Sequence, residues 1–332
     1  MNKNLLKTTN KLDRRLSIAP MMEWTDKHYR YFLRLISPNA LVYSVMITTG
    51  ALVYGKKTEF LEYNEEEHPI ALQLGGSNPK ELSYSAKLAE DYKYDEVNLN
   101  CGCPSDRVQK GKIGACLMLE PKLVAECVDA MKQVVSIPVT VKNRIGVDEN
   151  DSYEFLTDFI GTVAEKGCET FIIHARKAIL DGLSPAENRS IPPLQWETAY
   201  KLKRDFPHLE IVLNGGITEV DQVQEALNHL DGVMIGREAY KNPYFIADIE
   251  KAIFKNDNVP TREDVIKNLM PYIERHLANG LPLKDITRHI LGLYHCRKGG
   301  KKWRQILSEE AYKDNAGIEV IYNALKCTAT DL

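Results

Sequence analysis

Two cysteines separated by a single residue stand at the end of an apolar run, in the stretch NLNCGCPSDR over residues 98–107. Such a pair could be half of a metal site, a redox couple, two buried bystanders, or one reactive thiol with an inert neighbour. Zinc sites and dithiol redox couples usually separate their cysteines by two residues. The spacing therefore argues against both, and no metal site is expected.

The two cysteines differ in their expected surroundings. Gly102 and Pro104 break the strand pattern, so Cys103 is expected on a loop beyond the strand, whereas Cys101 still belongs to the strand. A single thiol on such a loop can act as a proton donor. Cys103 is therefore the candidate catalytic residue.

A lysine interrupts a second apolar run, VTVKNRIG over residues 139–146. Burying its ammonium group is costly unless the group faces an anion. Lys142 could face reduced flavin, pair with a core carboxylate, or form a Schiff base as in an aldolase. His174 and Gln73, near the ends of other runs, could hydrogen-bond a flavin, although a lone histidine at a strand end is more often structural.

Glycines follow the last two runs, in Asn214-Gly215-Gly216 and in Gly236-Arg237. Bare backbone N–H groups at these places can bind a phosphate, and the arginine can clamp it. The same glycines could simply make tight turns. Together with Lys142 they favour flavin mononucleotide (FMN) over a Schiff base, and the absence of a GxGxxG turn argues against a resident Rossmann-bound dinucleotide.

Eight short apolar runs must position these residues. They are rich in β-forming residues, alternate with helical patterns, and cover residues 16–21, 40–48, 70–76, 96–102, 139–146, 170–176, 211–217 and 232–240. Nearly continuous apolar strands are typical of parallel sheets that are covered on both sides. Eight β/α repeats predict a TIM barrel rather than a doubly wound open sheet, with the active site at the carboxyl ends of the strands.

Helix starts are also predicted. Asp151 has capping-box spacing to Glu154, Thr218 can cap the helix after the seventh run, and Pro121 can begin another helix. Beyond the barrel the pattern is helical only. We expect a lead-in over residues 1–15, an FMN-binding TIM barrel over 16–254, and a helical domain over 255–332 that begins with a linker at 255–260.

Composition limits the class of protein. The 332 residues are 44% hydrophobic and 27% charged, with a net charge of −3 and seven cysteines. No window resembles a membrane span or a secretory signal, so a cytoplasmic protein that does not bind membranes is expected. Residues 284–304 hold seven Lys/Arg against one Asp. This cluster, with Tyr294 and Trp303 interleaved, suits a surface that contacts nucleic-acid phosphates, although a charge run is often only a solvated helix face.

Six motifs, in order, resemble the tRNA-dihydrouridine synthases, most closely the bacterial A subfamily. They are LSIAPMM at 16–22, NLNCGCPSDR at 98–107, VKNRIG at 141–146, IHARK at 173–177, LSPAENR at 183–189 and LNGGI at 213–217. The resemblance implies reduction of D-loop uridines of tRNA at positions 20 and 20a. It implies FMN as cofactor and NADPH as external reductant, with hydride passing from flavin N5 to C6 and a proton from Cys103 to C5.

The resemblance also implies roles for particular residues. Flavin contacts are expected at Pro20, Met21, Met22, Gln73, Lys142 and His174, with the phosphate at Asn214, Gly215, Gly216, Gly236 and Arg237. Contacts with tRNA are expected at Asn100, Ala186, Arg189, Lys302 and Gln305. A monomer that binds the D-loop and elbow of tRNA is expected. The alternatives are an FMN barrel that reduces a free pyrimidine or other small molecule, a flavin-free aldolase or isomerase, and a non-catalytic tRNA-binding module.

Overall fold

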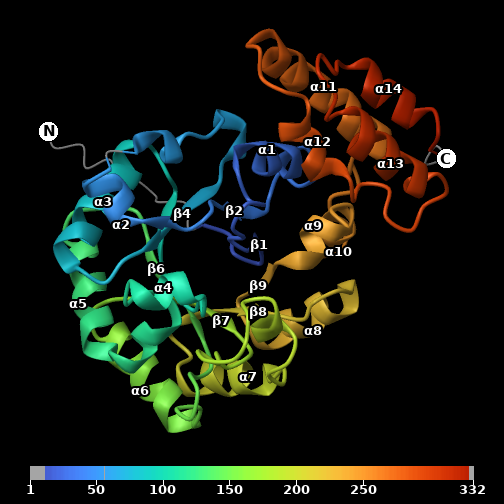
Figure 1. The fold of residues 1–332 in the computed structure, drawn as a ribbon. Coiled ribbons are helices and arrows are strands. Elements are labelled where there is room, and N and C mark those ends of the chain that lie inside the picture. Colours follow the sequence, from blue (N-terminus) through green and yellow to red (C-terminus); the bar gives the residue numbers. More distant parts are fainter. Residues whose placement is uncertain (1–11, 56, 329–332) are drawn as a thin grey trace, which may run out of the picture.

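The computed structural model describes residues 12–55 and 57–328, and its strands close into a parallel barrel (Figure 1). Around the barrel the strands follow the order β2–β1–β9–β8–β7–β6–β5–β4, and pairing of β2 with β4 completes the ring. The strands are β1 (Leu16–Ile18), β2 (Leu41–Tyr43), β3 (Ile47–Thr48), β4 (Ile70–Gly75), β5 (Glu96–Cys101), β6 (Val139–Arg144), β7 (Thr170–His174), β8 (Glu210–Asn214) and β9 (Gly232–Ile235). The predicted TIM barrel is confirmed.

Helices cover the outside of this barrel, and further helices follow it (Figure 1). Those of the barrel are α1 (Lys27–Ile36), α2 (Thr49–Val53), α3 (Pro79–Asp91), α4 (Asp106–Lys110), α5 (Pro121–Lys132), α6 (Tyr153–Ala164), α7 (Trp196–Asp205), α8 (Val220–His229), α9 (Arg237–Lys241) and α10 (Phe245–Phe254). Those beyond it are α11 (Arg262–Ala278), α12 (Lys284–Ile290), α13 (Gly300–Glu310) and α14 (Glu319–Leu325). Short 3₁₀ turns are η1 (Thr58–Leu61), η2 (Glu65–Glu67), η3 (Gly114–Leu119) and η4 (Glu187–Arg189). No helix in the described ranges is long and apolar enough to cross a membrane.

The second predicted strand, 40–48, is divided in the structure. After Tyr43, the hydroxyl of Ser44 accepts the backbone N–H of Gln73 at 3.0 Å, where a continuous ladder would use a backbone carbonyl. The short strand β3 then resumes pairing with β4, its register shifted by one residue. At the other end of the barrel sequence, the predicted strand 232–240 stops at Ile235, because Arg237 already begins α9.

Two of the three predicted helix starts were wrong by one residue. The side chain of Ser152, and not that of Asp151, accepts the N–H of Phe155 and caps α6. Glu219, and not Thr218, is the N-cap of α8, and its backbone N–H donates to the side chain of Gln222 at 3.2 Å. Helix α5 begins at Pro121 as predicted.

Two apolar layers hold the barrel together. The larger one fills the space between strands and helices, and a smaller one fills the barrel interior with Ala19, Leu41, Tyr43, Ala71, Ile172, Val212 and Met234. Below the inner layer, at the amino ends of the strands, Arg14 forms ion pairs with Glu96 and Glu210. Residues 1–11 of the expected lead-in lie outside the described residues, but Arg14 belongs to the floor of the barrel.

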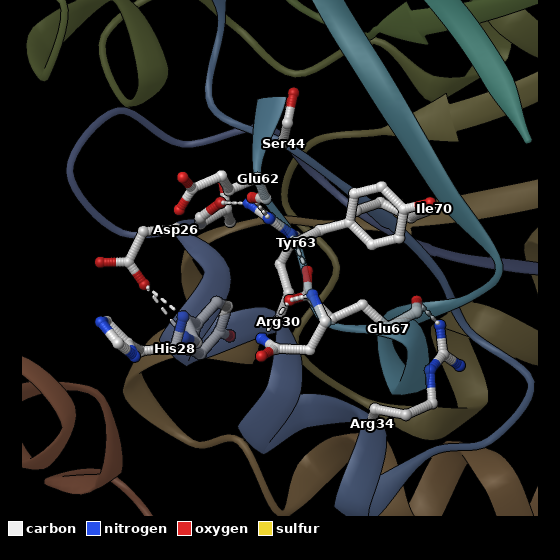
Figure 2. Close-up of polar contacts among 12 residues, drawn as sticks. Asp26, His28, Arg30, Arg34, Ser44, Glu62, Tyr63, Glu67 and Ile70 are labelled. Atoms are coloured by element: carbon white, nitrogen blue, oxygen red, sulfur yellow. Dashed lines mark hydrogen bonds and ion pairs between the residues drawn. The ribbon is translucent and has the colours of Figure 1, made fainter. Parts of the chain in front are cut away.

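The helices after the barrel pack against α1, at the amino end of that helix. Asp26 caps α1 by accepting the N–H groups of His28 and Tyr29 (Figure 2). The same carboxylate accepts bonds from His289 and Arg288 of α12. A second buried pair, Arg30 with Glu67 at 2.6 Å, fixes the other side of α1 (Figure 2). The segment 255–260 that joins α10 to α11 has no helix or strand.

Candidate active site

The carboxyl ends of β5 to β8 bring the predicted polar residues side by side. In the parallel register, Asn100 on β5 lies opposite Lys142 on β6, and His174 on β7 lies opposite Asn214 on β8. Arg144, at the end of β6, is the partner of His174 on the other side. Strand pairing alone therefore gathers an amide, an ammonium group, a guanidinium group and an imidazole at the barrel mouth.

Cys103 lies on the loop that follows β5, and this loop is held entirely by its backbone. The side-chain oxygen of Asn100 accepts the N–H groups of Gly102 at 3.1 Å and of Cys103 at 3.0 Å. The carbonyl of Cys103 accepts the N–H of Ala115, and that of Gly102 accepts Nε of Arg144 at 2.8 Å. The half-buried thiol itself has one polar contact, the hydroxyl of Ser105 at 3.5 Å.

The neighbouring cysteines are placed differently. Cys101 is fully buried in the layer between strands and helices, and burial raises the pKa of its thiol well above its usual range. Cys116 is half-buried, and its thiol donates to the carbonyl of Ile113 at 3.2 Å. No group of three His, Cys, Asp or Glu side chains within the described ranges could hold a metal ion. Cys101 therefore packs in the core, while Cys103 faces the mouth.

Lys142 is partly buried and donates to the side-chain oxygen of Asn214 at 2.8 Å, but it has no carboxylate partner within the described residues. Burial, reinforced by the nearby Arg144, lowers its pKa to about 7. Burial followed by the charges of Arg144 and Lys142 also lowers the pKa of His174 well below its usual range, so this imidazole is neutral. The proposal that Lys142 pairs with a core carboxylate finds no support in these contacts.

The expected phosphate side of the mouth combines two glycines with exposed and half-buried arginines. Gly215 and Gly216 have φ angles of +112° and +78°, and a Cβ on Gly216 would lie 2.4 Å from Leu194. These positions therefore require glycine, which leaves their backbone bare. Arg237, at the start of α9, donates to the carbonyl of Arg189 at 2.9 Å.

Arginine side chains close the outer part of the mouth. Arg144 is buried and bonds the carbonyls of Lys177 and Asn188, so it links the loops that follow β5, β6 and β7. The Nε atoms of Arg176 and Arg189 are buried without a hydrogen-bond partner in the described structure. Burial lowers the pKa of Arg189, and the charge of Arg237 adds to this effect.

Three amide side chains line the inner wall below the thiol loop. Gln73 is buried on β4 and donates to Asn98 at 2.8 Å, while its oxygen accepts Nδ2 of Asn100 at 2.8 Å. The segment after β1 also lies at this end of the barrel, where Met21 packs on the inner apolar layer and Met22 is exposed beside Pro20. Gly236 follows β9 at the mouth and is the N-cap of α9.

The residues expected to contact tRNA fall into two groups. Asn100 and Arg189 belong to the mouth, and the exposed Ala186 stands at the start of the turn η4 that carries Arg189. Lys302 and Gln305 are exposed on α13 and contact each other at 3.2 Å. The two aromatics expected on the same surface are buried, since Tyr294 and Trp303 pack together and Trp303 donates to the carbonyl of Ile290. That part of the prediction was wrong.

No role for Arg144 was predicted from the sequence. Its signal was a second basic residue two positions after Lys142, at a strand end where an apolar run should continue. The buried floor of Arg14, Glu96 and Glu210 was missed as well. Partners so far apart in sequence leave no local pattern.

Comparisons with known proteins show the family of the chain. The family description "Dihydrouridine synthase (Dus)" matches residues 17–329. Curated proteins called tRNA-dihydrouridine(20/20a) synthase are 61% identical in Shewanella oneidensis, over 100% of this chain and 99% of that one, and 58% identical in Escherichia coli K12, over 95% and 92%. A solved 2-naphthoyl-CoA reductase has a TM-score of 0.56 at 12% identity, over 73% of this chain and 50% of that chain, which shows a shared fold only.

Proposed function

Because this chain belongs to the dihydrouridine synthase family, and is thus a flavin-dependent oxidoreductase, we propose that it reduces uridine to dihydrouridine in the D-loop of tRNA, at positions 20 and 20a. FMN is the bound cofactor and NADPH the external reductant in this proposal. The observation that carries it is the half-buried thiol of Cys103, held by its backbone at the edge of a basic barrel mouth. A free pyrimidine as substrate is less well supported, since the similar curated proteins are named for tRNA.

The residues of the mouth fit a flavin mononucleotide. Lys142 has no carboxylate partner among the described residues, and the neutral His174 lies beside bare glycine backbone at Gly215 and Gly216. An ammonium group favours negative charge on a reduced ring, and glycine N–H groups with Arg237 favour a phosphate. Gln73, Asn214, Gly236 and the segment Pro20–Met22 supply the remaining contacts in this proposal. When bound, the reduced cofactor supplies the hydride that adds to C6 of the uracil.

Cys103 then completes the reduction. Addition of hydride at C6 of the uracil leaves a basic carbon atom at C5, and the thiol of Cys103 transfers its proton to that atom. Asn100 and Arg189 contact the RNA beside the thiol. The buried, unpartnered Nε of Arg189 is suited to a ligand oxygen that arrives with the substrate.

The tRNA extends from the mouth onto the helices after the barrel, which we propose as the tRNA-binding domain at 255–332. Helix α13 exposes Lys301, Lys302, Arg304 and Gln305 in a molecule with a net charge of −3. Such a local concentration of cations favours phosphate contacts with the D-loop and elbow. Ala186 would meet the RNA from the barrel side. We further propose a cytoplasmic monomer, since its substrate is tRNA.

Two measurements test this function. The purified protein should be yellow, lose its colour with NADPH, and convert unmodified tRNA to a product heavier by two mass units at positions 20 and 20a. A colourless protein with no flavin after denaturation would refute the cofactor. A yellow protein that reduces free uracil or uridine but not tRNA would favour the small-molecule alternative.

A further inference from the structure

A continuous chain of hydrogen bonds runs along the inside of the barrel, from its charged floor to the loop of Cys103. It begins at Glu96, which accepts the hydroxyl of Thr140 at 2.7 Å, and Thr140 in turn accepts Nδ2 of Asn98 at 2.9 Å. Gln73 donates to Asn98 and accepts from Asn100, and Asn100 accepts the backbone N–H groups of Gly102 and Cys103. Glu96, Thr140, Asn98 and Gln73 are almost completely buried.

The direction of every bond in this chain is set at its lower end. Glu96 is paired with Arg14, at 2.8 Å from Nε, and an ionised carboxylate can only accept hydrogen bonds. The single hydroxyl hydrogen of Thr140 points to this carboxylate, so the hydroxyl oxygen accepts from Asn98. Tyr43 also donates to Glu96, which uses the remaining capacity of the same oxygen.

The same constraint passes upward through three amides. The NH₂ group of Asn98 is directed to Thr140, so its oxygen receives the NH₂ group of Gln73, whose oxygen receives that of Asn100. The oxygen of Asn100 then faces the N–H groups of Gly102 and Cys103. If the amide of Asn100 were reversed, its NH₂ group would oppose those two donors and the loop could not keep this conformation.

We propose that Thr140 is a positioning residue, which through Asn98, Gln73 and Asn100 fixes the backbone of the loop that carries Cys103. The proposal rests on the proposed function only in so far as Cys103 is the proton donor. Thr140 contacts neither the thiol nor the mouth. The Arg14–Glu96 pair orients the hydroxyl of Thr140, and this hydroxyl sets the donor and acceptor directions of the amides that hold the thiol loop.

Thr140→Val tests this, because valine keeps the shape of threonine and removes its hydroxyl. Thr170→Val is the matched control, since Thr170 is also a buried strand threonine whose hydroxyl donates to a floor carboxylate, that of Glu210 at 3.0 Å. Thr170 is not part of the hydrogen-bond chain that leads to Cys103. Thr140→Ser restores the hydroxyl. Hydrogen exchange of the flavin-loaded protein is measured by mass spectrometry on peptides that contain Gly102 and Cys103.

In Thr140→Val, exchange at these amides should accelerate about tenfold, and kcat for tRNA should fall about tenfold or more while KM changes less than about twofold. Thr140→Ser should restore both values and Thr170→Val should change neither. Equal exchange in the two valine variants would overturn the proposal, whatever the activity. If Thr140→Val does not fold, Asn98→Asp, which removes the NH₂ donor one step higher, should give the same pattern.

The exchange measurement also separates this proposal from the proposed function. If the wild-type protein does not reduce tRNA, the function fails, but accelerated exchange confined to Thr140→Val still supports the positioning role. If tRNA is reduced normally by Thr140→Val and exchange is unchanged, the positioning role fails and the function stands.

Discussion

Replacing Cys103 by alanine should remove the proton donor while leaving the site assembled. The thiol has one polar contact, with Ser105 at 3.5 Å, whereas the four bonds that hold the loop all use backbone atoms of Gly102 and Cys103. None of those bonds is lost in Cys103→Ala. Removing one half-buried sulfur atom should cost about 1 kcal/mol of folding free energy or less.

The chemical cost should be much larger than the structural cost. General acid catalysis by a positioned group typically contributes about 10²–10⁴ in rate, which is about 3 to 5 kcal/mol of activation free energy. A water molecule that enters the space left by the sulfur atom would not be held in place as a proton donor to C5. We therefore expect kcat for tRNA to fall by about 10² or more, with flavin content and tRNA affinity within about twofold of the wild type.

The assay mixes pre-reduced protein with excess tRNA without oxygen and follows the return of flavin absorbance in a single turnover. This isolates the chemical step from reduction by NADPH, and mass spectrometry of the tRNA confirms the product. Flavin content is read from the absorbance of the denatured protein, and tRNA affinity from a binding titration.

Two cysteine variants serve as controls. Cys101→Val should have nearly normal turnover, because Cys101 is buried away from the mouth. Cys116→Ala should also be close to normal, although Cys116 is half-buried like Cys103. Normal single-turnover rates in Cys103→Ala would refute the assignment of Cys103 as proton donor. A loss of turnover confined to Cys116→Ala would show that Cys116 is the donor instead.

Three further variants probe the charges. In Lys142→Met, the affinity for reduced FMN should fall and lose its pH dependence. In the wild-type apoprotein the pKa of Lys142 is about 7, and binding the anionic reduced ring takes up a proton, so this affinity should decrease by up to about tenfold per pH unit above pH 7 in an anaerobic titration. Arg14→Met should lower unfolding free energy by about 3–5 kcal/mol in a denaturant titration, because it removes the ion-pair partner of the buried carboxylate of Glu96. Combined neutralisation of Lys301, Lys302 and Arg304 by glutamine should reduce tRNA affinity and the steepness of its salt dependence, without changing flavin content.

The barrel could be predicted from the sequence because its signals are local. Each strand is a short apolar run, and each run is followed by a helical pattern, so eight repeats identify the architecture without knowledge of any contact. Errors arose where a single side chain decided the outcome. The hydroxyl of Ser44 divides the second strand, and Ser152 takes the capping position from its neighbour Asp151.

The site was predicted less completely, for a related reason. Polar residues that break apolar runs, such as Lys142 and Asn100, are visible in the sequence. The consequences of folding are not, and they include the burial that lowers the pKa of Lys142 and the packing that hides Trp303. The charge run that contains Trp303 was read as one surface, but a helix divides its residues between two faces.

The two ends of the barrel differ in whether their charged side chains form ion pairs, and this difference indicates where a ligand binds. At the floor, the carboxylates of Glu96 and Glu210 are both paired with Arg14. At the mouth, none of five cationic side chains has a carboxylate partner in the described ranges, and the hydrogen bonds that they donate there go to carbonyl or amide oxygens. They are Lys142, Arg144, Arg176, Arg189 and Arg237.

Burying cations beside one another is unfavourable unless an anion completes the site. Burial first, and the charges of neighbouring cations second, lower the pKa values of Lys142, Arg144, Arg176 and Arg189. A phosphorylated cofactor and an RNA backbone both supply such an anion. The mouth should therefore gain stability from either ligand alone, since each would relieve repulsion that the folded chain does not relieve by itself. This follows from the charges alone and does not depend on which residue donates the proton.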